Sequence, residues 1–127
     1  MQKVNRSTCP AESWGERCSA FRLLAGTDLA VAEEVMPAGT SERRHVHAKA
    51  RQFFYVLAGR LTMAGPAGEA TLGPGDGLEI APGVAHRAHN PFAEAARFLV
   101  ISAPTTEGDR TDLGCLTTVS TGVAFSR

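Results

Sequence analysis

The residues best suited to chemistry in this sequence are its four histidines, His45, His47, His86 and His89. His45 and His47 are separated by one residue, and in a β-strand two such side chains point to the same face, about 7 Å apart. Two imidazoles at that spacing can converge on one metal ion, and His86, which follows a tight turn at 81–83, is the best placed third ligand. Imidazoles with open coordination positions suit iron, manganese, nickel, copper or zinc. A lone His-x-His is more often a surface pair, so the surrounding residues decide the interpretation.

The residues around the histidines form two spaced motifs. The first runs from Gly39 through five residues to His45-x-His47, then through four to Gln52 and six to Gly59; the second runs from Gly75 through five residues to Ala81-Pro82-Gly83, then through two to His86 and three to Asn90. Together they resemble the two motifs of the cupin family. This resemblance, which covers residues 39–90, implies a double-stranded β-helix (jelly-roll) barrel, usually dimeric. It also implies a divalent metal inside the barrel at His45, His47 and His86.

Two positions depart from the family pattern. Ala81 stands where the second motif usually has proline, but Pro82 follows directly and keeps the turn rigid. Gln52 stands where the first motif usually has a glutamate ligand. An amide carries no charge, so the protein would leave the charge of the cation uncompensated, which favours an anionic, chelating substrate. Three interpretations of Gln52 stay open: a weak metal ligand, a hydrogen-bonding neighbour of a water or a histidine ring, and a degenerate site that holds no metal.

Strand parity extends the candidate site beyond its ligands. Phe54 and Val56 share the parity of Gln52, so they form either an apolar wall of a small-molecule pocket or simply part of the core. Arg43 shares the parity of His45 and either reaches a substrate carboxylate at the barrel mouth or is a solvated charge.

Short β-forming runs, separated by thirteen glycines and seven prolines, predict the elements that must position these side chains. No segment has the pattern of a helix of ten or more residues. We therefore predict an all-β sandwich or barrel, with an N-terminal arm at 1–17 that Trp14 anchors and a single barrel domain at 18–127. The predicted strands lie at 19–25, 29–36, 52–57, 60–63, 69–72, 78–80, 97–102 and 116–125.

The composition argues against several other classes. A chain of 127 residues suffices for one domain, and its thirteen basic residues balance thirteen acidic ones, so no electrostatic footprint for nucleic acid or an anionic membrane is present. The sequence has no apolar stretch of membrane-spanning length and no apolar signal segment at its start. Three cysteines without C-x-x-C spacing complete the prediction of a reduced, cytoplasmic protein.

The leading functional prediction is a metal-dependent enzyme that acts on a small chelating, anionic molecule. Within the cupins, three-histidine sites without the carboxylate resemble those of non-haem iron dioxygenases, so the resemblance favours a dioxygenase. Two alternatives stay open: a non-catalytic binding or sensing barrel, and a redox-neutral isomerase or lyase. The expected partners are a small-molecule ligand and a second copy in a homodimer, without nucleic acid or membrane.

Overall fold

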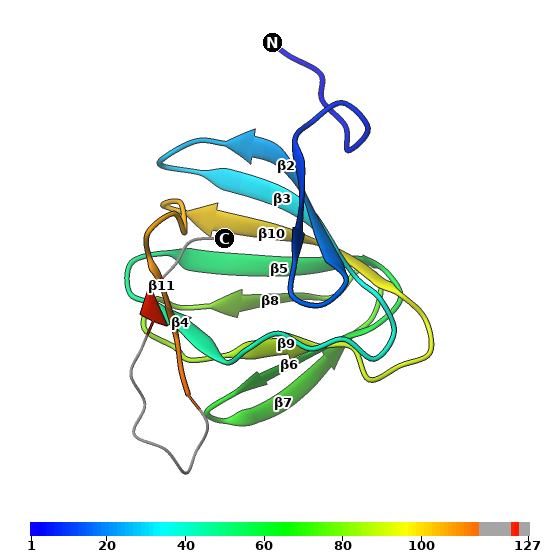
Figure 1. Cartoon of the computed structure of the whole chain (residues 1–127), viewed down its shortest axis with the longest axis vertical. Helices are drawn as coiled ribbons and strands as arrows, with labels where there is room; N and C mark the ends of the chain where they lie inside the picture. The colour runs from blue at the N-terminus through cyan, green and yellow to red at the C-terminus, as the bar shows by residue number, and fades with distance from the viewer. Residues whose placement is uncertain (115–122, 125–127) are drawn as a thin grey trace.

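The computed structural model describes residues 1–114 and 123–124, in which twelve β-strands are joined by turns (Figure 1). The strands are β1 (Ala11–Trp14), β2 (Cys18–Ala25), β3 (Ala30–Met36), β4 (His45–His47), β5 (Arg51–Ala58), β6 (Leu61–Gly65), β7 (Gly68–Leu72), β8 (Gly77–Ile80), β9 (Arg87–His89), β10 (Ala96–Ala103), β11 (Arg110–Asp112) and β12 (Val123–Ala124). The part of the chain that the structure describes contains no α-helix. The all-β prediction is confirmed.

The strands form one large sheet and two small ones. The large sheet has the order β1-β2-β3-β10-β5-β8, and the small sheets have the orders β12-β11-β4 and β7-β6-β9. Isolated bridges from Ser41 to His89 and from His45 to His86 join the two small sheets. Between the described strands, no ladder joins the small sheets to the large one, so the sheets are not closed into a continuous barrel. The result is a jelly roll in which the small sheets form the second wall.

Alternation along the central strands decides which side chains face the interior. In β5, Gln52, Phe54 and Val56 are buried, whereas Phe53 and Tyr55 between them are exposed. Apolar side chains from both walls meet in one core, which includes Met36, Phe54, Val56, Leu61, Met63, Leu72, Ile80, Phe98 and Val100. The period of two that β-structure imposes therefore places Gln52 inside the protein.

Four strands, β1, β4, β9 and β11, are absent from the predicted strand ranges. β4, β9 and β11 have only three residues each, too few for an alternating pattern to be recognised. β1 lies within the expected N-terminal arm and pairs with β2 from Ala11 opposite Phe21 to Trp14 opposite Cys18. Trp14 packs against the core, as an anchor of this segment would. The strand predicted at 116–125 lies mostly outside the described residues, which include only β12 of that segment.

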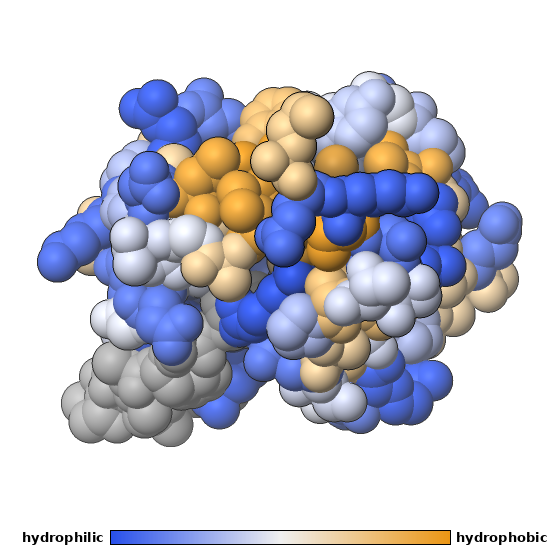
Figure 2. All heavy atoms as spheres, turned by 90° about the horizontal axis from the view of Figure 1, so that it is seen from above, coloured by the Kyte–Doolittle hydropathy of each residue, from blue (hydrophilic) through white to orange (hydrophobic). Residues whose placement is uncertain are grey.

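The surface mixes apolar and hydrophilic side chains. Seen from above in Figure 2, the two kinds lie side by side on one face. Exposed large apolar residues include Leu24 and Leu29 near the β2–β3 turn, and Phe53 and Tyr55 on the outer face of β5. Among the described residues no helix has the length and apolarity needed to span a membrane. The homodimer stays a prediction.

Candidate metal centre

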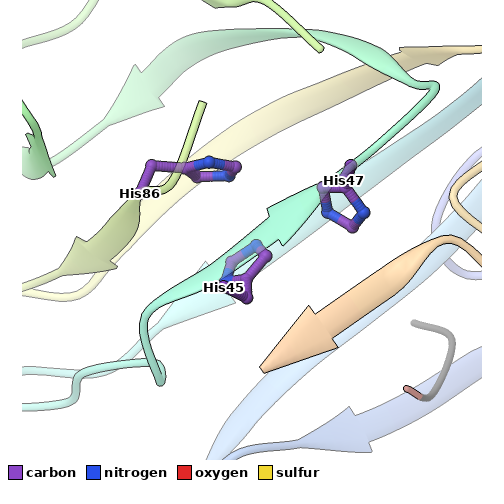
Figure 3. Close-up of side chains that lie close together, drawn as sticks. All are labelled: His45, His47 and His86. Atoms are coloured by element: carbon purple, nitrogen blue, oxygen red, sulfur yellow. The ribbon is translucent and has the colours of Figure 1, made fainter. Parts of the chain in front are cut away.

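Three histidines from two separate segments meet inside the jelly roll (Figure 3). His45 and His47 lie on β4, and His86 immediately precedes β9. The N–H groups of His45 and His86 each donate to the carbonyl of the other residue, at 3.0 and 2.9 Å, which places their side chains on the same face. The possible ligand atoms of the three rings all lie within 4.8 Å of one another, and all three residues are buried. The structure thus brings the three predicted ligands together.

Each imidazole is oriented by a backbone carbonyl that accepts a hydrogen bond from Nδ1–H. The acceptors are the carbonyls of Arg43 for His45 (2.8 Å), Val84 for His86 (2.9 Å) and Asp109 for His47 (3.2 Å). Because a carbonyl can only accept, Nδ1 carries the proton of each neutral ring and Nε2 keeps its lone pair. The Nε2 atom of His45 is buried, and no group in the described part of the chain hydrogen-bonds to it. A nitrogen in this state fits a metal ligand.

Asp109 fixes the His47 end of the site. Its carboxylate accepts hydrogen bonds from the N–H groups of Ala48, Lys49 and Ala50 at 2.9–3.2 Å. Its carbonyl oxygen is the acceptor for the His47 ring. Asp109, which directly precedes β11, therefore holds both the β4–β5 turn and the candidate ligand His47 in place.

Burial sets the charge of His45. The pKa of His45 is lowered from 6.5 to about 3, mainly because burial desolvates the ring, and this effect outweighs the opposing effect of Glu42, whose Oε1 lies 4.0 Å from His45 Nδ1. The guanidinium of Arg110 and the ring of His86 contribute to the lowering. His45 is therefore a neutral imidazole near pH 7, and a metal ion need not displace a proton from its Nε2.

Gln52 presents a carbonyl oxygen rather than a charge. Its amide Nε2 donates to Ser102 Oγ at 3.2 Å, which orients the side chain. Its Oε1 is buried, and no donor among the described residues reaches it. Three imidazoles and an unengaged amide oxygen fit a divalent transition metal. Whether Gln52 ligates the metal stays a prediction.

A small cavity adjoins the His47 side of this site. Its volume is about 30 Å³, and it is lined by His47 of β4, Gln52 of β5, and side chains of β1, β2, β3 and β10. Its charged lining residues are Glu12, Arg22 and Glu34. The cavity therefore combines polar groups from the large sheet with one of the three candidate ligands, His47.

The other predicted site residues lie in different surroundings. The ring of Phe54 is edge-on to that of His86, with centroids 6.2 Å apart, and it is part of the core. Val56 lies deeper in the core and does not line the cavity. The side chain of Arg43 is 71% exposed, lies 3.8 Å from Asp112 and lines a second pocket, of about 510 Å³, that His47 does not line.

Sequence reasoning missed the three charged residues of the cavity. Arg22 and Glu34 lie at inward positions of predicted strands. A charged residue at a core-facing position is unusual, and this was the feature of the sequence that could have identified them as candidate site residues. Glu12 gave no signal, because β1 was not predicted. That Arg22 and Glu34 share a cavity with His47 depends on the pairing of β3 with β10, which is distant in sequence, and on the pairing of β2 with β3.

Comparison with known families decides which fold this is. A model of the cupin domain matches residues 32–102, more than half of the chain. This protein belongs to the cupin family. No curated protein matches it by sequence.

Similar solved structures, among them proteins of the cupin superfamily, confirm the double-stranded β-helix fold. The polyketide cyclase RemF from Streptomyces resistomycificus has a TM-score of 0.73 and 22% identity, over 81% of this cupin and 79% of that chain. A cupin-superfamily sugar phosphate isomerase from Silicibacter pomeroyi has a TM-score of 0.74 and 21% identity, over 94% and 85% of the two chains. A predicted oxalate decarboxylase from Thermotoga maritima has a TM-score of 0.75 and 18% identity, over 81% and 99%. At these identities the likeness concerns the fold alone.

Proposed function

We propose that this cupin binds one divalent transition metal through His45, His47 and His86 and acts as an enzyme on a small, chelating anion. The observation that carries the proposal is the neutral donor set. The ring N–H groups are engaged by carbonyls, and an amide stands in place of a carboxylate. Such a set leaves the positive charge of the cation for an anionic ligand to neutralise. When bound, the metal would supply Lewis acidity to chelating oxygens.

Oxygenation is the first candidate reaction. A three-histidine site without a carboxylate resembles those of non-haem iron dioxygenases. The Phe54 ring against His86 gives the site an apolar side that keeps water away from a bound substrate. In this reaction the protein would orient the substrate and exclude solvent, while Gln52 would hold its place through Ser102.

A redox-neutral proton transfer is the second candidate, and Glu34 favours it. Glu34 is buried, with 6% of its surface exposed, and lines the same cavity as His47. A carboxylate in such a place can take a proton from a carbon next to a polarised carbonyl. The cyclase and the isomerase among the similar structures are named for reactions that leave the oxidation state of the substrate unchanged.

Metal content tests the proposal. Protein purified without added metal and analysed by elemental methods should carry about one equivalent of a single transition metal. His45→Ala and His86→Ala should each lose it. His89→Gln is the matched control, because His89 lies 3.3 Å from Glu69 and outside the three-histidine cluster, and this variant should keep its metal. Unchanged metal content in His45→Ala would sink the proposal.

Two measurements separate the reactions. Iron in the protein together with substrate-dependent oxygen uptake supports oxygenation. Zinc or nickel, no oxygen uptake, and deuterium exchange next to the carbonyl of a bound 2-oxo acid support proton transfer. In that case Glu34→Gln should slow the exchange at least about 100-fold, while the metal content stays the same. A metal-bearing protein that does neither is a binding module.

A further inference from the structure

A charged pair at the cavity indicates how a substrate is recognised. Arg22 lies on β2 with the inward parity of the buried Ala20, and it lines the same cavity as His47 and Gln52. Its Nη2 lies 2.5 Å from Oε1 of Glu12 on β1. The planar guanidinium of arginine offers several N–H donors in a geometry that matches a carboxylate. The cavity thus already contains one carboxylate bound to one arginine.

The carboxylate of Glu12 comes from a weakly held edge strand. Glu12 is in register with Ala20, so it stands on the same face of the sheet as Arg22, two residues further along β2. Among the described strands β1 pairs only with β2, and three of its four residues are exposed. An ion pair between partly exposed side chains contributes little to stability. Glu12 can therefore leave Arg22 at small cost.

The size of the cavity explains why Glu12 must move. With Glu12 in place, the volume of about 30 Å³ holds only about two water molecules. The lining combines the small side chains of Ala20, Ala30 and Ala32 with the larger ones of Leu24, Val31 and Val100. Glu12 is the lining residue that stands on the exposed edge strand, so its displacement is the simplest way to make room for a substrate. The carboxyl group of Glu34 lines the same cavity. A carboxylate of the substrate that enters beside Glu34 therefore needs a neighbouring positive charge, and Arg22 supplies one.

We propose that Arg22 binds a carboxylate of the substrate, and that Glu12 stays ion-paired with Arg22 until the substrate displaces it. The inference rests on the proposed metal site, because the chelating end of the substrate must face the three histidines. It narrows the substrate class to small molecules that carry chelating oxygens at one end and a carboxylate at the other.

The test uses zinc-loaded protein and matched pairs of 2-oxo acids. Oxaloacetate is compared with 2-oxobutanoate, and 2-oxoglutarate with 2-oxopentanoate, so that only the first of each pair has a far carboxylate. Calorimetric titration should show that the wild type binds at least one dicarboxylate about tenfold more tightly than its partner. Arg22→Gln should remove this preference and change the affinity for the monocarboxylates less than about twofold. Glu12→Gln should tighten binding of the dicarboxylate, because it removes the internal competitor.

Arg51→Gln is the matched control. Arg51 forms an ion pair with Glu79 at 3.2 Å that is more exposed than the Arg22–Glu12 pair, and Arg51 does not line the cavity, so its loss should leave the preference intact. The inference is overturned if neither dicarboxylate is preferred by the wild type, or if Arg22→Gln keeps the preference. Zinc content separates the two proposals. A wild type that holds no zinc overturns both, whereas bound zinc and monocarboxylate without any preference overturn only the role of Arg22.

Discussion

Gln52 controls how much charge the protein contributes to the candidate metal site. Its side chain is oriented by Ser102, and its oxygen is the buried atom that a glutamate would replace with a carboxylate. Gln52→Glu should therefore raise zinc affinity by about tenfold or more, equivalent to about 1.4 kcal/mol. It should also weaken the binding of anionic chelators. Both affinities can be measured by competition with a chromogenic chelator and by calorimetry.

Gln52→Leu separates the effect of charge from that of shape. It removes the amide oxygen without adding charge, so zinc affinity should fall or stay the same. A Gln52→Glu variant that binds zinc no more tightly than Gln52→Leu would mean that residue 52 does not face the metal.

His45 should make the stability of the metal-free protein depend on pH. The pKa of His45 is about 3 in the folded protein and 6.5 for an exposed histidine, so between these values the unfolded chain binds a proton that the folded chain does not. Stability should be highest above pH 6.5 and fall as the pH drops toward 3, by about 1.4 kcal/mol per pH unit for one such group. Urea unfolding after chelator treatment, at pH 7.5 and pH 5, measures this slope.

A substitution of His45 measures how much this residue contributes to the change of unfolding free energy with pH. His45→Asn should flatten the slope by about one proton. Equal slopes in the wild type and His45→Asn would contradict the assignment.

At the scale of the elements, Gly59 is required where β5 ends. Its φ is +73°, and a Cβ built on it would lie 2.2 Å from the carbonyl oxygen of Ala95, just before β10. Gly59→Ala should therefore destabilise the protein by more than the about 1–3 kcal/mol that backbone strain alone costs. Urea unfolding compares it with Gly39→Ala, where φ is +75° but no atom lies within 4 Å of the added Cβ. Equal losses of unfolding free energy in the two variants would show that the backbone at Ala95 moves aside without cost.

At the scale of the whole molecule, a metal would link the two small sheets. His45 and His47 belong to the β12-β11-β4 sheet, whereas His86 adjoins β9 in the other, and isolated bridges join the two. A metal bound only by the folded protein at 100 times its Kd should add about 2.7 kcal/mol of stability, seen as a rise of several degrees in Tm.

Scanning calorimetry with zinc and with excess chelator checks this linkage. His86→Ala should lower the Tm of the metal-free protein and also abolish the zinc-dependent rise. A rise of the same size in His86→Ala would place the zinc elsewhere.

The amino-acid sequence by itself determined the all-β class, the cupin family and the three histidines. These follow from local properties, because strand alternation and motif spacing are set by residues near one another in the chain. The spacing of His45, His47 and His86 relative to the glycines was enough to select the three histidines that the structure brings together, and positive φ at Gly39, Gly59, Gly75 and Gly83 explains why the motifs carry glycine there.

Only the tertiary structure decided which other side chains reach the site. Arg22 and Glu34 line the same cavity as His47 because β2 pairs with β3 and β3 with the distant β10, and no local pattern specifies the register of β3 on β10. The pairing of β1 with β2 places Glu12 on Arg22, whereas Arg43 lines a second pocket that His47 does not line. Register between strands far apart in sequence is set by packing across the whole core, so the charged lining of the cavity is a property of the fold and not of any one motif.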